Sequence, residues 1–162
     1  QLGRAGVGLY GGNPLASGKA SDVGLKPVVS VFGKVLQVRG IKAGTPVGYG
    51  GTYTASADER VMIIGVGYAD GVPRLLSNQG HIFVQGKRCA IRGRVSMDML
   101  HADASKVDVA VGDWVEVMGA NICVDDIAAQ AQTISYEVFT GLGKRLHRVY
   151  RNDSESGLIE GR

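Results

Sequence analysis

The sequence predicts a mostly β domain, a partly closed barrel-like sheet with one or two short helices near the C-terminus. Its 25 glycines separate short runs of valine and isoleucine, which is the pattern of strands joined by tight turns. The stretches with helical spacing and capping residues lie near the end of the chain, at 124–131 and 135–142. A length of 162 residues with 44% hydrophobic content suits a single domain with a substantial core.

Several classes of protein are excluded by composition. No apolar run approaches the roughly 18 residues of a membrane-spanning helix, and residues 1–12 lack the apolar core of a secretory signal. The net charge of +3 comes from scattered bases, unlike a nucleic-acid-binding surface. Cys89 and Cys123 have no histidines at ligand spacing, so neither a metal site nor a disulfide framework is indicated. We therefore expect a cytoplasmic protein with two reduced thiols and no metal, membrane or nucleic-acid partner.

The expected elements follow in chain order. Residues 4–14 are glycine-rich, and we interpret them as a strand end running into a loop. Residues 27–38 and 60–67 are β-branched or continuously apolar, which predicts two core strands, with Gly33 a candidate bulge. Further strands are expected at 81–84, 88–94, 114–118 and a closing strand at 146–150, with a hairpin turn at 85–87.

The C-terminal part holds the helices and a tail. An acidic residue is expected to cap the helix at 124–131, and Ser135 the helix at 135–142. Residues 152–162 form a polar tail that is either native or left over from expression, so it is set apart from the fold.

Two glycine-rich loops are candidates for chemistry. Tyr49 lies between Gly48 and Gly50, which permit positive φ, so the backbone can turn sharply and project the phenol. Taken alone, such a tyrosine is more often a packing or turn residue. Around Gly6 and Val7, consecutive N–H groups could cradle a phosphate, or the glycines could simply form a turn.

Phenols and cations recur where the expected elements end. The residues concerned are Tyr49, Tyr68, Arg74, Arg94, Met97, Asp98 and Tyr136. If these ends meet at one rim, a nearby cation would favour the phenolate, and lowering a phenol pKa from about 10 to about 7 takes roughly 4 kcal/mol. Taken singly, Arg74 and Arg94 would be surface residues and Met97 a core residue. Together they predict proton transfer by tyrosine.

Five ordered motifs are more specific than any single residue. They are Arg-x-Gly-Val-x-Leu-Tyr-Gly (4–11), Val-Gly-Tyr-Gly-Gly-Thr-Tyr-Thr-Ala (47–55), Gly-Tyr-Ala-Asp-Gly-Val-Pro-Arg (67–74), Gly-Arg-Val-Ser-Met-Asp-Met (93–99) and Tyr-Glu-Val (136–138). Over roughly residues 1–150 the chain resembles the C-terminal portion of the pyridoxal-phosphate-dependent alanine racemase family, of fold type III.

This resemblance implies a two-domain enzyme that forms a head-to-tail homodimer and interconverts L- and D-alanine. Residues 1–12 would be the last strand and phosphate loop of an N-terminal (β/α)8 barrel, and residues 13–151 the C-terminal β domain. Tyr49 would be the catalytic base on the L-alanine face, reaching into the barrel of the partner subunit.

The cofactor contacts also follow from the resemblance. Arg4 would bond the pyridine nitrogen of pyridoxal 5'-phosphate. The backbone N–H groups of Gly6 and Val7, and the hydroxyl of Tyr136, would bind its phosphate. Arg94 would bond its phenolic oxygen and help to orient the substrate.

The remaining residues of the motifs would contact or admit the substrate. By the same resemblance, the backbone N–H of Met97 would meet the substrate carboxylate, while Tyr68 and Arg74 would line a narrow access channel. Asp98 would have a supporting part.

The family's second base is a lysine that also holds the cofactor, in an early motif of the type Lys-Ala-x-Ala-Tyr-Gly. No lysine of this sequence has that context; they are Lys19, Lys26, Lys34, Lys42, Lys87, Lys106 and Lys144. We therefore expect the chain alone to bind no cofactor covalently and to be inactive without a barrel supplied from outside. Alternative interpretations are a broad-specificity or serine racemase of the same family, and a non-catalytic β module for dimerisation.

Overall fold

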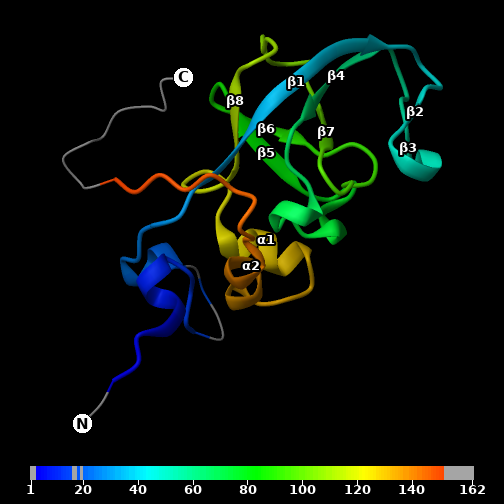
Figure 1. The fold of residues 1–162 in the computed structure, drawn as a ribbon. Coiled ribbons are helices and arrows are strands. Elements are labelled where there is room, and N and C mark those ends of the chain that lie inside the picture. The colour runs from blue at the N-terminus through cyan, green and yellow to red at the C-terminus, as the bar shows by residue number, and fades with distance from the viewer. Residues whose placement is uncertain (1–2, 16–17, 19, 152–162) are drawn as a thin grey trace.

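A six-stranded antiparallel sheet forms the body of the computed structural model, which describes residues 3–15, 18 and 20–151. The strand order is β6-β5-β8-β1-β4-β7 (Figure 1). The strands are β1 (Val31–Ile41), β4 (Glu59–Ile64), β5 (His81–Val84), β6 (Lys87–Ala90), β7 (Leu100–Asp103) and β8 (Trp114–Met118), and a separate hairpin pairs β2 (Pro46–Val47) with β3 (Tyr53–Thr54). The mostly β fold predicted from the sequence is confirmed.

The long strand β1 joins the two halves of the sheet, because it pairs with β8 near its start and with β4 further along. Its register shifts between Val31 and Phe32 against β8, and again beyond Val35 against β4. These irregularities flank Gly33 rather than fall on it. An added Cβ at Gly33 would lie 2.4 Å from Ile64 Cγ2, so this glycine allows β1 to pack closely on β4.

The two outer strands of the sheet approach one another. An antiparallel bridge between Ile91 and Ala102 connects the segment after β6 to β7. This contact nearly closes the sheet into a barrel, as the sequence predicted. The hairpin turn expected between β5 and β6 is also present, with positive φ at Gln85 and Gly86.

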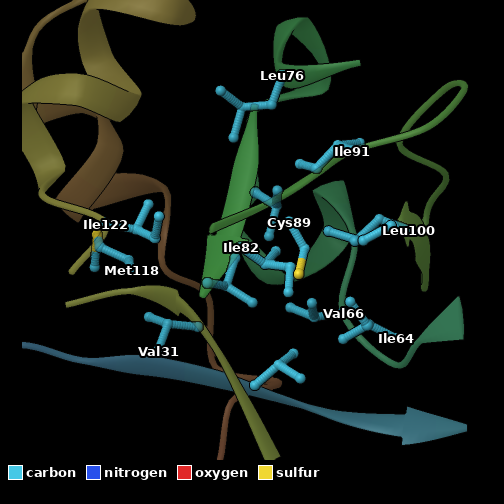
Figure 2. Packing of buried hydrophobic residues seen from close by; sticks show 14 of the residues in the cluster. Val31, Ile64, Val66, Leu76, Ile82, Cys89, Ile91, Leu100, Met118 and Ile122 are labelled. Carbon is cyan, nitrogen blue, oxygen red and sulfur yellow. The ribbon is translucent and has the colours of Figure 1, made fainter. Parts of the chain in front are cut away.

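Apolar side chains from every strand of the sheet fill the interior of the barrel. Figure 2 shows part of this cluster, including Val31, Ile64, Val66, Leu76, Ile82, Cys89, Ile91, Leu100, Met118 and Ile122. A second, smaller cluster of Ile41, Val47, Ala55 and Val61 lies where β2 and β3 leave the sheet. Burial of this cluster attaches the hairpin to the barrel.

The two predicted helices are confirmed as α1 (Val124–Gln130) and α2 (Ser135–Gly141), which lie together at one end of the barrel (Figure 1). Their caps differ from the expectation. Cys123 caps α1, because its Sγ accepts from the backbone N–H of Asp126 at 3.4 Å. Ser135 is not a cap; its hydroxyl donates to Asp125 Oδ1 at 2.5 Å and thereby joins the two helices.

The N-terminal segment packs on these helices. Residues 6–10 form the 3-10 helix η1 (Gly6–Tyr10) in place of the strand end that we predicted. Val7 is only 2% exposed, and the Tyr10 ring lies 5.7 Å from that of Phe139 on α2. Burial of Val7, together with the contact between the Tyr10 and Phe139 rings, favours the compact turn over an extended strand. A further 3-10 helix, η2, covers Ala20–Val23.

One predicted strand is wrong and another was not predicted. Residues 146–150 form no strand, and Val149 and Tyr150 are 64% and 86% exposed. The place expected for a closing strand is taken by β7, which lies beside β4 and meets the segment after β6. The polar tail at 152–162 lies outside the described residues. Within the described part of the chain, no helix is long and apolar enough to cross a membrane.

Candidate active site

Tyr49 lies at the tip of the hairpin formed by β2 and β3, in the 3-10 turn η3 (Tyr49–Gly51). The flanking Gly48 and Gly50 have φ of 72° and 70°, the left-handed region expected from their sequence. An added Cβ at Gly50 would lie 2.9 Å from Arg94 Nη1. Glycine thus leaves room for the Arg94 guanidinium beside the tyrosine loop, while the Tyr49 side chain is 72% exposed.

A polar cluster at the base of the hairpin supports it. The Tyr53 hydroxyl donates to Glu59 Oε2 at 3.1 Å, and the Arg92 guanidinium lies 4.6 Å from the Tyr53 ring centroid. Arg92 also pairs with Asp103 at 3.0 Å. Burial, and then the hydrogen bond to Glu59, raise the pKa of Tyr53 above its ordinary value of 10.0. Tyr53 therefore stays protonated and keeps donating to Glu59.

Two further loops are joined by backbone hydrogen bonds. Tyr68 opens η4 (Tyr68–Asp70), and its N–H donates to Ser96 O at 2.9 Å. The N–H of Ala69 donates to Met97 O at 3.0 Å. The phenol of Tyr68 and the backbone of Met97 are thus placed on adjoining segments.

Arg145 ties the segment after α2 to the same two loops. It pairs with Asp98 at 2.6 Å and with Asp70 at 3.3 Å. Asp98 therefore has an ionic partner within this chain.

The three loops surround a pocket of about 690 Å³. Its lining includes Tyr49, Tyr68, Arg74, Arg94, Met97 and Asp98, together with Gly48, Val95, Ser96, Met99 and His101. Arg74 comes from the 3-10 turn η5 (Arg74–Leu76). All of the residues expected to share a rim are therefore brought together except Tyr136. The arrangement places two tyrosines and two arginines around one cavity.

Tyr136 lies instead beside Gly6. It is the second residue of α2, and its hydroxyl would lie 3.2 Å from an added Cβ at Gly6, whose φ is 58°. A left-handed glycine facing a hydroxyl, with Val7 in the same turn, is suited to holding a phosphate through backbone N–H groups. Arg4 is exposed just before η1 and does not line the pocket.

His101 also lines the pocket, although no motif of the sequence points to it. It lies on β7, whose alternation of buried Leu100 and Ala102 with half-buried His101 is the period-two signal that could have revealed the strand. Its Nδ1 is buried, and among the described residues nothing hydrogen-bonds to it. Burial, and then the charge of Arg39, lower the pKa of His101 below its ordinary value of 6.5.

This lowered pKa predicts a pH-dependent stability. His101 binds a proton more readily in the unfolded chain than in the folded one. Its contribution to the unfolding free energy is therefore unfavourable as the pH falls below 6.5. In urea titrations between about pH 7 and about pH 5, where histidine titrates, the unfolding free energy of His101→Thr should fall less than that of the wild type. All other titrating groups are common to both proteins. If the unfolding free energies of the two proteins change in parallel with pH, the prediction is contradicted.

Comparisons with known proteins agree with this geometry. The family model described as "Alanine racemase, C-terminal domain" matches residues 28–150. The chain belongs to this family. The resemblance seen in the five motifs is thereby confirmed.

Alanine racemases from several bacteria are similar to the chain. The alanine racemase of Hahella chejuensis is 44% identical over 153 residues, covering 94% of this chain and 41% of that protein. The structure of the biosynthetic alanine racemase from Pseudomonas aeruginosa superposes with a TM-score of 0.87 at 39% identity, covering 91% of this chain and 41% of that one. The structure of the alanine racemase from Bartonella henselae with covalently bound pyridoxal phosphate superposes with a TM-score of 0.82 at 39% identity. The match covers 90% of this chain and 40% of that one. The chain thus spans about two fifths of the length of the curated relatives it matches.

Proposed function

We propose that this alanine racemase C-terminal domain supplies the tyrosine that transfers a proton at Cα of alanine on the L face. The observation that carries the proposal is the pocket in which Tyr49, Tyr68 and Arg94 meet from three separate loops. Tyr49 is 72% exposed at the tip of a hairpin, which supports a role in a site completed by another chain. We therefore propose a homodimer in which Tyr49 acts in the partner's barrel.

The other lining groups would orient and admit the substrate. Arg94 lies against the Tyr49 loop, so it would hold the substrate beside the phenol. The backbone N–H of Met97 would bind the substrate carboxylate. Tyr68 and Arg74 line the same pocket and would narrow the access to it.

The residues present fit pyridoxal 5'-phosphate. The left-handed Gly6 against the Tyr136 hydroxyl supports a phosphate cradle completed by the N–H groups of Gly6 and Val7. Arg94 would bond the phenolic oxygen of the cofactor, and Arg4 its pyridine nitrogen. When bound, the cofactor would accept the negative charge left at Cα.

The covalent anchor and the second base would come from outside this chain. Among the described lysines, none lines the pocket. Incubation of the chain with pyridoxal 5'-phosphate, reduction with borohydride and measurement of the intact mass should therefore show no specific pyridoxyl adduct and no turnover of alanine. An adduct on one of these lysines together with turnover would contradict this part of the proposal.

The proposed function is tested in the complete racemase that carries this domain. It should convert L-alanine to D-alanine in an assay coupled to D-amino-acid oxidase, and prefer alanine when serine competes. Changing Tyr49→Phe and Arg94→Ala together should abolish growth of a D-alanine auxotroph that depends on the enzyme. Full growth of the double variant would indicate a non-catalytic module, and preference for serine would indicate a racemase of different specificity.

A further inference from the structure

The Ser77–Asn78 turn follows η5 and contacts the Arg94 loop on both sides of Arg94. The N–H of Gly93 donates to Asn78 Oδ1 at 2.6 Å, and the N–H of Val95 donates to Ser77 Oγ at 3.0 Å. The N–H groups of the residues before and after Arg94 are thus both held by side chains of the Ser77–Asn78 turn. The guanidinium of Arg94 therefore extends from a segment that is held by a side-chain hydrogen bond at each end.

The same turn also reaches the loops that carry Tyr49 and Arg74. Asn78 Nδ2 donates to Thr52 O at 3.2 Å and lies 3.3 Å from Thr52 Oγ1, directly after the Tyr49 turn. The Ser77 hydroxyl donates to Arg74 O at 2.5 Å. Two adjacent side chains therefore connect three segments that line the pocket.

The base of the hairpin is held by its apolar cluster and by the Tyr53 contacts, whereas its tip relies on other loops. Two residue pairs join β2 to β3, with further backbone bonds from Ala55 to residues 44 and 45, and a two-stranded hairpin of this size has little stability of its own. The Arg94 loop lies directly against it, because an added Cβ at Gly93 would lie 2.5 Å from Val47 O. Asn78 is itself exposed and lies outside the hydrophobic core. Loss of its side chain would therefore remove hydrogen bonds and no apolar packing.

We infer that Asn78, assisted by Ser77, is a positioning residue that sets the distance between Tyr49 and Arg94, an inference that rests on the proposed function. Its amide oxygen accepts a hydrogen bond from the Arg94 loop, and its amide nitrogen donates one to the segment that follows Tyr49. A catalytic group displaced by about 1 Å can lose about 100-fold in rate. Removal of the amide should therefore act on the rate of proton transfer more than on folding.

Asn78→Gly in the complete racemase removes the side chain without straining the backbone, since the φ of Asn78 is 60°. We expect kcat to fall by about 10- to 100-fold, with a smaller change in KM for alanine. Amide exchange at residues 93–95 should become faster. Ser77→Ala is a separate variant, at a residue with an ordinary φ of −52°, and it removes the two hydrogen bonds of the Ser77 hydroxyl. It should also lower kcat, even if Asn78→Gly folds poorly.

Gln85→Gly is the matched control. Gln85 also has a left-handed φ, of 49°, and its amide makes two hydrogen bonds to the Asp108 backbone, at 2.9 and 3.0 Å, outside the pocket. This variant should keep the wild-type kcat while losing some thermal stability, because its two hydrogen bonds are removed. The inference is overturned if both Asn78→Gly and Ser77→Ala keep the wild-type kcat while Tyr49→Phe is inactive. If Tyr49→Phe is also fully active, the proposed function itself fails.

Discussion

Tyr49→Phe is expected to lower the rate of proton removal from L-alanine by about 10²- to 10⁴-fold, the usual contribution of a positioned acid–base group. The change removes the hydroxyl that would take up the proton and keeps the ring. Because Tyr49 is 72% exposed at the hairpin tip, little packing is lost and the unfolding midpoint should not move. A lower rate with an unchanged unfolding midpoint would therefore reflect loss of the proton-transferring hydroxyl and not loss of folded protein.

Exchange of the Cα proton with solvent deuterium, followed by NMR in the complete racemase, measures each face separately. For Tyr49→Phe, exchange should slow by that factor when the reaction starts from L-alanine and persist when it starts from D-alanine, because the other base is intact. Tyr150→Phe is the control, since Tyr150 is also exposed and does not line the pocket. Normal exchange of both enantiomers by the Tyr49 variant would exclude this tyrosine as a base.

Gly67→Ala should destabilise the protein by about 1–3 kcal/mol through overpacking. The φ of Gly67 is −150°, which any residue adopts, so the cost comes from collision alone. An added Cβ would lie 2.3 Å from Ser96 O and 2.4 Å from Met97 O. Those carbonyls accept the hydrogen bonds that join the Tyr68 loop to the Met97 loop, so relief of the collision must open the pocket.

Gly40→Ala provides the comparison, because a Cβ at Gly40 on β1 meets nothing within 4 Å. Urea unfolding should give a lower midpoint for Gly67→Ala and a midpoint equal to or above the wild type for Gly40→Ala. Amide exchange at Tyr68 and Ala69 should be faster only in the Gly67 variant. Equal midpoints for the two variants would show that the two loops can separate without cost.

Elements with strong local patterns were predicted from the sequence with small errors in their bounds. The apolar run that became β4, the turn at Gln85 and Gly86, and both helices each show their structure in adjacent residues. β7 is only four residues long and was missed. The segment at 146–150 has suitable residues for a strand but has no partner, and pairing is decided by distant parts of the chain.

Only part of the candidate site was predicted, because local motifs are visible in the sequence and contacts between distant segments are not. The motifs identified Tyr49, Arg94 and Met97, and glycines mark the Tyr49 loop and the start of the segment that carries Arg94 and Met97. His101 and Asn78 went unnoticed, because no feature of adjacent residues shows that β7 faces the pocket or that an amide links two loops.

The sequence by itself determined the fold class, the family and the loops that carry chemistry, since turns, strand runs and motifs are properties of neighbouring residues. The tertiary structure alone decided which of those loops meet. Tyr49, Tyr68 and Arg94 share a pocket because β1 joins both halves of a nearly closed sheet, whereas Tyr136 lies apart beside Gly6. Such contacts depend on strand pairing and side-chain hydrogen bonds between segments that lie far apart along the chain.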